Sequence, residues 1–115
     1  MGGADSAGSA LSSVEVYDPV ANTWSTKSPM STARDWAASA VVGGRIYVMG
    51  GGSGSTAYSS VESYDPATNL WTAGPPMNVA RMGSSAAVVG GVIYVFGGYN
   101  NASVELNSVE AFTAP

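Results

Sequence analysis

The side chains best suited to chemistry are two aspartates, Asp18 and Asp65, and two arginines, Arg34 and Arg81. Paired carboxylates can serve as acid and base in hydrolysis. Both aspartates, however, stand in the same Tyr-Asp-Pro setting 47 residues apart, so a shared catalytic site would be a coincidence of the repeat. The sequence has no histidine and no cysteine, which removes the commonest general base, thiolate nucleophiles and cysteine metal ligands. We therefore expect no catalytic residue, no metal site and no cofactor.

Composition and charge exclude further classes. Of the 115 residues, 45% are hydrophobic and 10% are charged, with a net charge of −4, whereas an ordinary soluble domain has about 25% charged residues. The four cations, which include Lys27 and Arg45, are scattered, and this argues against nucleic-acid binding. No apolar run approaches the roughly 18 residues of a transmembrane helix. The low lysine content and the lack of cysteine favour a bacterial, extracellular origin without identifying a compartment.

An internal repeat organises the chain. Residues 14–19 return as residues 61–66, and residues 41–51 return as residues 88–98, both at a shift of 47. A partial third copy covers residues 108–112. Fixed spacing of this kind is typical of repeat architectures. The shorter matches at the same shift are Trp24 and Trp71, Pro29-Met30 and Pro76-Met77, and Arg34 and Arg81.

The repeated segments predict short strands, since Val, Ile, Tyr and Trp favour pleated surfaces. One repeat contains four, at about residues 36–42, 45–51, 60–64 and 70–73, which we name a, b, c and d. The Gly-Gly pairs between a and b predict two-residue hairpin turns, where positive φ is required. The Asp-Pro turns between c and d use the aspartate to accept backbone hydrogen bonds. No segment has a convincing helical period.

A Gly-Gly doublet after an Ile-Tyr-Val strand, followed by Tyr-Asp-Pro, Trp, Pro-Met and Arg, resembles the Kelch repeat. The resemblance covers nearly the whole chain twice. It implies an all-β fold in which each repeat forms one four-stranded antiparallel blade of a β-propeller, with about four to eight blades around a channel. Residues 1–115 are then one propeller segment. The resemblance assigns structural roles to these markers: Tyr17, Trp24, Arg34, Gly50, Gly51, Tyr64, Trp71, Arg81, Gly97 and Gly98.

The resemblance also implies a ligand face. The b–c and d–a loops of an antiparallel blade emerge at one end, and in the Kelch family that face commonly binds partner peptides. Trp36 and Tyr99 are the strongest candidates because aromatic anchors dominate interfaces. Since no arginine follows the structural arginines here, binding of acidic peptides is not expected. The full set of candidate positions is Asp35, Trp36, Gly52, Ser53, Tyr58, Met82, Tyr99 and Asn100.

The repeats do not close a ring by themselves. The strand order is c-d, a-b-c-d, a-b-c, so only one blade is complete, and repeat arrays need neighbours to bury their faces. We expect identical chains to complete the ring. A homotrimer gives six blades, with the N-terminal c-d strands of one chain completing the last blade of the next; a dimer or tetramer gives four or eight. Because residues 108–112 are also a c strand, the chain has three c strands for two blades, and one of the three is then displaced, disordered or redundant.

Three functions are compatible with this sequence. The first is a non-catalytic protein-interaction or assembly scaffold. The second is a fragment or engineered propeller piece with no ligand, which the near-identity of the repeats and the start within a blade favour. The third is a carbohydrate-related or enzymatic role inherited from a secreted bacterial parent. We expect neither nucleic acid nor membrane as a partner.

Overall fold

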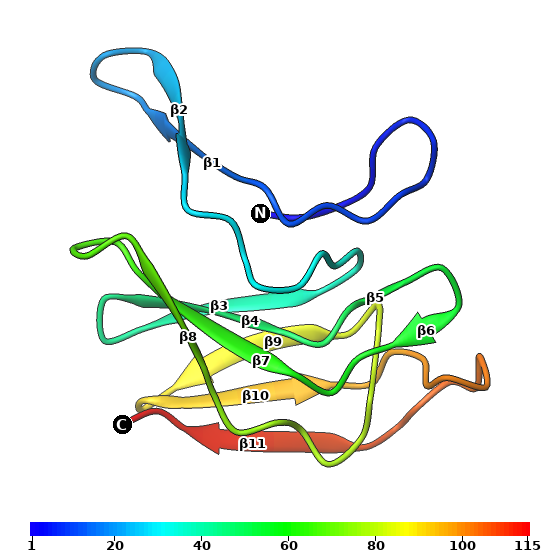
Figure 1. Cartoon of the computed structure of the whole chain (residues 1–115). Helices are drawn as coiled ribbons and strands as arrows, with labels where there is room; N and C mark the ends of the chain where they lie inside the picture. Colours follow the sequence, from blue (N-terminus) through cyan, green and yellow to red (C-terminus); the bar gives the residue numbers. More distant parts are fainter.

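The computed structural model describes all 115 residues as short antiparallel strands stacked in three layers, with no helix (Figure 1). Consequently no helix is long and apolar enough to cross a membrane. The N-terminal layer is a two-stranded hairpin, the middle layer a four-stranded sheet in the order β3-β4-β7-β8, and the last layer a three-stranded sheet in the order β9-β10-β11. The strands are β1 (Val14–Asp18), β2 (Thr23–Lys27), β3 (Ala38–Val42), β4 (Arg45–Met49), β5 (Gly52–Ser53), β6 (Thr56–Ala57), β7 (Val61–Asp65), β8 (Leu70–Ala73), β9 (Ser85–Val89), β10 (Val92–Phe96) and β11 (Val109–Thr113).

The middle sheet is the complete blade that the repeat predicts, with strands a to d as β3, β4, β7 and β8. Strand a begins at Ala38 rather than at residue 36, because Trp36 has a φ of 56°. Strand b ends at Met49, because Gly50 and Gly51 follow with φ of 65° and 77°. A left-handed backbone cannot continue a strand.

Turn chemistry sets the register of the a–b hairpins. Gly43 and Gly44 both have positive φ, of 57° and 75°, and Gly90 and Gly91 have 57° and 77°. Two successive residues with positive φ match the twist of the flanking strands in a two-residue hairpin. Both hairpins therefore reverse at the predicted positions. The short β5–β6 hairpin inside the b–c connection was not predicted; it reverses at Gly54, where φ is 59°.

The main core lies between the middle and last sheets. Tyr47, Met49 and Val61 of the middle blade pack against Ile93 and Val95 of the last, and all five are at most 6% exposed. The first strands β3 and β9 contact each other, as neighbouring blades do around a common axis (Figure 1). A smaller cluster of Val14, Met30 and Val48 joins the N-terminal hairpin to the middle blade.

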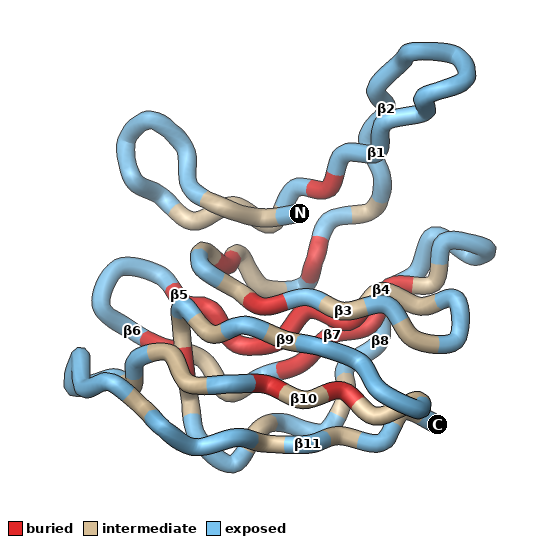
Figure 2. The backbone as a smooth tube through the Cα atoms, turned by 180° about the vertical axis from the view of Figure 1, so that it is seen from behind, coloured by how far each residue is buried: buried red, intermediate tan, exposed pale blue.

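Each of the two outer layers leaves apolar residues uncovered on its outer side, and Figure 2 shows the β1–β2 hairpin as almost wholly exposed. Tyr17 is 41% exposed whereas its repeat equivalent Tyr64 is 5% exposed. Trp24 is 67% exposed. On the far side of the last sheet, Val89 and Phe96 are 68% and 42% exposed. Each of these positions is one that a neighbouring blade would cover.

The third c strand is part of a sheet. β11 pairs with β10 in the register Tyr94↔Ala111, and β7 pairs with β4 in the matching register Tyr47↔Ser63. In the single chain β11 is therefore neither displaced nor disordered. The strand without a b-strand partner is instead β1, which pairs only with β2.

Candidate interaction site

Arg34 lies at the junction between layers, in the segment that links β2 to β3. Its side chain is 0% exposed. It donates four hydrogen bonds to the middle blade: to the carbonyl oxygens of Gly50 (2.7 Å) and Ser60 (3.1 Å), to Ser60 Oγ (3.1 Å) and to Glu62 Oε2 (2.8 Å). The ring of Tyr58 lies 5.9 Å from the guanidinium carbon, within reach of a cation–π contact. Arg34 thus joins strands b and c from outside the blade.

Glu62 is the charged partner of Arg34 and is itself only 3% exposed. Burial raises the pKa of Glu62, but hydrogen bonds from the Ser31 amide, the Ser31 hydroxyl and Arg34, together with the charge of Arg34, outweigh that effect and hold the pKa below its usual value. The carboxylate therefore stays ionised. Its oxygens are taken up by structural donors, so it is not available as a general acid.

The same network recurs one repeat later around Arg81. Its side chain is 0% exposed and donates to the carbonyl oxygens of Gly97 (2.9 Å) and Ser108 (3.2 Å), to Ser108 Oγ (3.0 Å) and to Glu110 Oε2 (2.8 Å). The amides of Asn78 and Val79 donate to the Glu110 carboxylate. Burial raises the pKa of Glu110, and these hydrogen bonds with the charge of Arg81 lower it by more. The contacts of the two arginines are equivalent, and in both places they join a linking segment to strands b and c of the following layer.

The Gly doublets allow this close approach. A Cβ atom at Gly50 would collide with the carbonyl oxygen of Arg81, and one at Gly51 would lie 2.5 Å from the carbonyl oxygen of Asp35. Gly98 stands in the same relation to the carbonyl oxygen of Met82, at 2.6 Å. No side chain fits at these positions, and their positive φ independently favours glycine.

An aromatic pair on the c and d strands makes a second contact between the layers. In the middle blade, Tyr64 and Trp71 lie 5.1 Å apart, and the Trp71 indole donates to the carbonyl oxygen of Ser28 at 2.8 Å. The Tyr64 hydroxyl donates to Asn69 Oδ1, which also accepts from the Ser28 amide. The d strand of the middle blade is thereby bound to the segment that comes from the preceding layer.

The two aspartates act as turn formers. Asp18 Oδ1 accepts from the amide of Val20, and Asp65 Oδ1 accepts from the amide of Ala67, both close to 3.0 Å. Asp65 also lies 3.5 Å from Arg45 in an exposed ion pair. No three His, Cys, Asp or Glu side chains are close enough to hold a metal ion.

The candidate ligand face is a rim where d–a segments meet b–c loops (Figure 1). Asp35 and Gly52 exchange two backbone hydrogen bonds at 2.8 Å, and Met82 and Tyr99 exchange two at 3.0 and 2.8 Å. Trp36 connects these two pairs, because its carbonyl oxygen accepts a hydrogen bond from the amide of Gly83. Gly83 in turn lies close to the rings of both Trp36 and Tyr99. The rim borders a shallow hollow of about 150 Å³ lined by Asp35, Trp36, Gly52, Gly54 and Met82.

Trp36 is the unusual residue of this rim. It is 61% exposed and has a φ of 56°, a left-handed conformation that a bulky residue adopts at a cost of about 1–2 kcal/mol. The equivalent position in the next repeat is Gly83, with a φ of 68°, where no such cost exists. A strained, exposed aromatic side chain at a loop junction is a candidate contact for a ligand.

The remaining candidates lie in different surroundings. Ser53 is in the exposed β5–β6 hairpin. Tyr58 packs over Arg34 and belongs to the arginine network. Asn100 uses its Oδ1 to accept from the amides of Ala102 and Val104, so it shapes its own loop. Sequence reasoning did not identify the carboxylates Glu62 and Glu110, although the Val-Glu pair that recurs in each copy was available as a signal.

Comparison with protein families agrees with this geometry. The model of the Kelch motif matches residues 1–31, 37–78 and 80–113, which is nearly the whole chain in three consecutive copies. The chain belongs to the Kelch family. Kelch repeats form β-propeller blades that mediate protein interactions, and Kelch domains are generally non-catalytic scaffolds. The three matched segments correspond to the three layers of the structure.

Proposed function

We propose that this Kelch chain is a non-catalytic assembly and interaction scaffold, and that its 115 residues act as one propeller segment that closes a ring with identical chains. The observation that carries the proposal is the exposure of repeat positions on both outer layers. Tyr17 and Trp24 on one side, and Val89 and Phe96 on the other, are apolar and uncovered. Burial of apolar area contributes about 25 cal/mol per Å², so complementary outer layers of two chains have a reason to associate.

Two blades per chain make the trimer the favoured ring, because three chains supply six blades. The unpaired edge of β1 supports association as well, since open strand edges are templates for pairing. The N-terminal c-d hairpin of one chain and the a-b strands of the next have the sequence of one repeat. If the chain is instead a propeller piece without a ligand, the same exposed surfaces favour aggregation and are not a specific interface.

The mass of the purified chain in solution tests this proposal. Light scattering coupled to size-exclusion chromatography should give about three times the chain mass of 11.6 kDa. Two or four times that mass would also support a closed ring, of four or eight blades. A folded, stable species at the mass of one chain, across the accessible concentration range, would contradict homo-oligomerisation.

We also propose the hollow lined by Asp35, Trp36 and Gly52 as the ligand face of the assembled scaffold, because the Trp36 side chain is exposed in a backbone conformation that costs free energy. Peptide and glycan arrays probed with the purified protein test it. The Trp36→Gly variant should lose any binding and keep its fold, since Gly83 occupies the equivalent position with the same backbone conformation. Val20→Ala, at a 95% exposed site in a c–d turn, is the control and should bind normally. Equal binding by both variants would refute the assignment.

A further inference from the structure

The two ends of the chain contain the same loop, which leads into a c strand at each end. Residues 2–18 and residues 97–113 are related by a shift of 95 positions, and the backbone hydrogen bonds within residues 2–13 coincide with those within residues 97–108. Both segments run from a Gly doublet, through a small loop closed by an Asx turn, into a c strand. The matched hydrogen bonds are Gly2 N to Ser13 O with Gly97 N to Ser108 O, Leu11 N to Gly3 O with Leu106 N to Gly98 O, Asp5 N to Ser9 O with Asn100 N to Val104 O, and Ala7 N to Asp5 Oδ1 with Ala102 N to Asn100 Oδ1.

The two segments differ in what they contact. The C-terminal segment places β11 on β10 and its Glu110 on Arg81. The N-terminal segment carries Ser13 and Glu15 at the positions of Ser108 and Glu110. Arg34, Arg45 and Arg81, the only arginines of the chain, pair with Glu62, Asp65 and Glu110. Glu15 therefore has the setting of an arginine acceptor, and no arginine in its own chain stands at the matching position.

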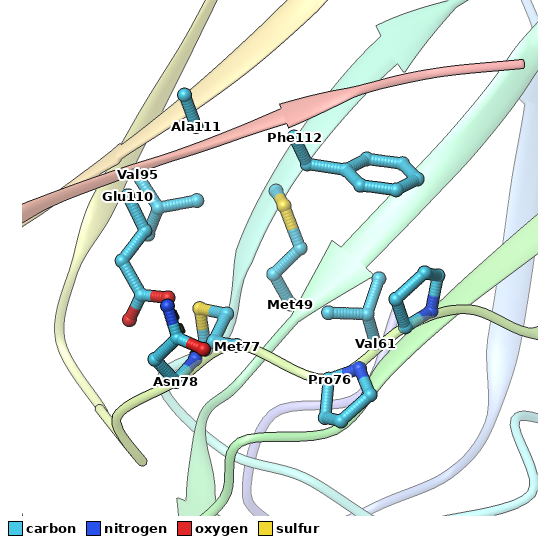
Figure 3. A pocket seen from close by; sticks show the side chains of 10 residues that line it. Met49, Val61, Pro76, Met77, Asn78, Val95, Glu110, Ala111 and Phe112 are labelled. Atoms are coloured by element: carbon cyan, nitrogen blue, oxygen red, sulfur yellow. Dashed lines mark hydrogen bonds between the residues drawn. The ribbon is translucent and has the colours of Figure 1, made fainter.

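β11 does not fill the whole space beside β10. Beside it lies a pocket of about 250 Å³ between Phe112 and the segment of Pro75, Pro76 and Met77 (Figure 3). In the middle blade the equivalent of Phe112 is Tyr64, and the d-strand residue Trp71 lies beside it and donates to Ser28 O. Pro75 is the repeat equivalent of Ser28, at a shift of 47. The pocket therefore lies where a d-strand tryptophan belongs.

The β1–β2 hairpin carries that tryptophan. Trp24 lies 5.2 Å from Tyr17, in the same tilted arrangement as Trp71 and Tyr64. Tyr17 donates to Asn22 as Tyr64 donates to Asn69. One contact has no counterpart: Pro75 lacks the N–H with which Ser28 donates to Asn69.

We propose that the β1–β2 hairpin of a second copy replaces residues 97–113, pairs with β10, presents Glu15 to Arg81 and inserts Trp24 beside Pro75. The proposal rests on the homo-oligomer proposed above and adds how its assembly is regulated. β11 pairs with β10 of its own chain and so competes with the incoming hairpin for the assembly site. In the exchanged state each arginine keeps a carboxylate, and the last blade gains a d strand. The partner copy thus contributes the residues that complete this site.

The competition sets how assembly depends on concentration. β11 has the advantage of being covalently attached, so its effective concentration at β10 is high. The incoming hairpin has the advantage of a second strand and a tryptophan, with Trp24 going from 67% exposed to covered. Dilute chains therefore keep β11 in place, and concentrated chains exchange it.

A matched pair of charge-neutralising variants tests the exchange, measured by light scattering and sedimentation of the full chain. Glu110→Gln weakens the competitor, so the association constant should rise by about ten-fold, the equivalent of about 1.4 kcal/mol. Glu15→Gln weakens the incoming strand, so the constant should fall by a similar factor. Glu105→Gln, an exposed carboxylate in the loop before β11, is the control and should leave it unchanged.

A second measurement covers the case in which a variant fails to fold. A synthetic peptide with the sequence of residues 106–115, added in excess to the wild-type oligomer, should dissociate it, while a scrambled peptide should not. If the wild type associates but both glutamine variants shift in the same direction, or the peptide has no effect, the exchange is overturned and the oligomer stands. If wild type and Glu110→Gln are both single chains at every concentration, the oligomer itself is refuted together with the exchange.

Discussion

Replacing Arg34 by methionine is the sharpest test of how the blades are joined. The substitution keeps an unbranched side chain in place of the arginine stem but removes four hydrogen bonds and the partner of Glu62. Both side chains of the pair are at most 4% exposed. Removal of one member of a buried ion pair costs about 3–5 kcal/mol, because the other charge stays buried and unpaired.

That loss is large for a chain of this length. Domains are stable by about 0.05–0.15 kcal/mol per residue, so 115 residues correspond to about 6–17 kcal/mol. Urea unfolding, followed by tryptophan fluorescence and far-UV circular dichroism, should show the loss as a lower midpoint with an unchanged slope. The double variant Arg34→Met with Glu62→Met should lose less than the two single variants together, by about 2 kcal/mol.

Arg45→Met is the matched control. Arg45 forms a 3.5 Å ion pair with Asp65, and its side chain is 42% exposed, so the loss should stay below about 1 kcal/mol. The reasoning is refuted if Arg34→Met unfolds at the same urea concentration as Arg45→Met, or if the double variant is as destabilised as the sum of its parts.

Three further predictions use the same unfolding assay. The folded-state pKa of Glu62 is lowered, so its contribution to stability is complete above the unfolded pKa of about 4.3 and disappears as pH falls through the folded value; Glu62→Gln should flatten this acid dependence, and an unchanged pH profile would be inconsistent with the ion pair. Gly50→Ala should cost at least about 2 kcal/mol more than Gly43→Ala, since both have positive φ but only Gly50 meets neighbouring backbone, and equal losses would count against close blade approach. Trp71→Phe should cost about 1 kcal/mol through the lost indole hydrogen bond to Ser28, while Trp24→Phe should have no effect on the dissociated chain; the opposite ranking would contradict the assignment of outer and inner faces.

The repeat made most of the fold predictable. Periodic residues gave the four strands of the middle blade, and the Gly43-Gly44 pair determined the register, because a hairpin turn with two positive φ angles has few alternatives. The predicted ends of strands a and b differ from the observed ends by two residues. They depend on where the backbone turns left-handed, and Trp36 does so although its side chain disfavours it.

The site was less predictable than the fold, because contacts between layers depend on packing. The sequence indicated that Arg34 and Arg81 have structural roles but did not name Glu62 and Glu110 as their partners. Tyr58, predicted as a ligand-face residue, instead packs over Arg34, because of how the b–c loop returns to the blade. The β5–β6 hairpin depends on a two-residue reversal at Gly54 and Ser55 that polar, glycine-rich sequence does not distinguish from an irregular loop.

The location of Arg34 between two layers has a consequence for the addition of further repeats to the chain. The segment of residues 30–34 hydrogen-bonds through its backbone to the layer before it, at Gly3, Leu11 and Ser12, and through the Arg34 guanidinium to the layer after it. Any stretch of one 47-residue repeat therefore contains one buried arginine together with one carboxylate that can accept from it, wherever the stretch begins. Because each repeat carries one such arginine and one such carboxylate, adding or removing a whole repeat leaves the number of buried positive and negative charges balanced.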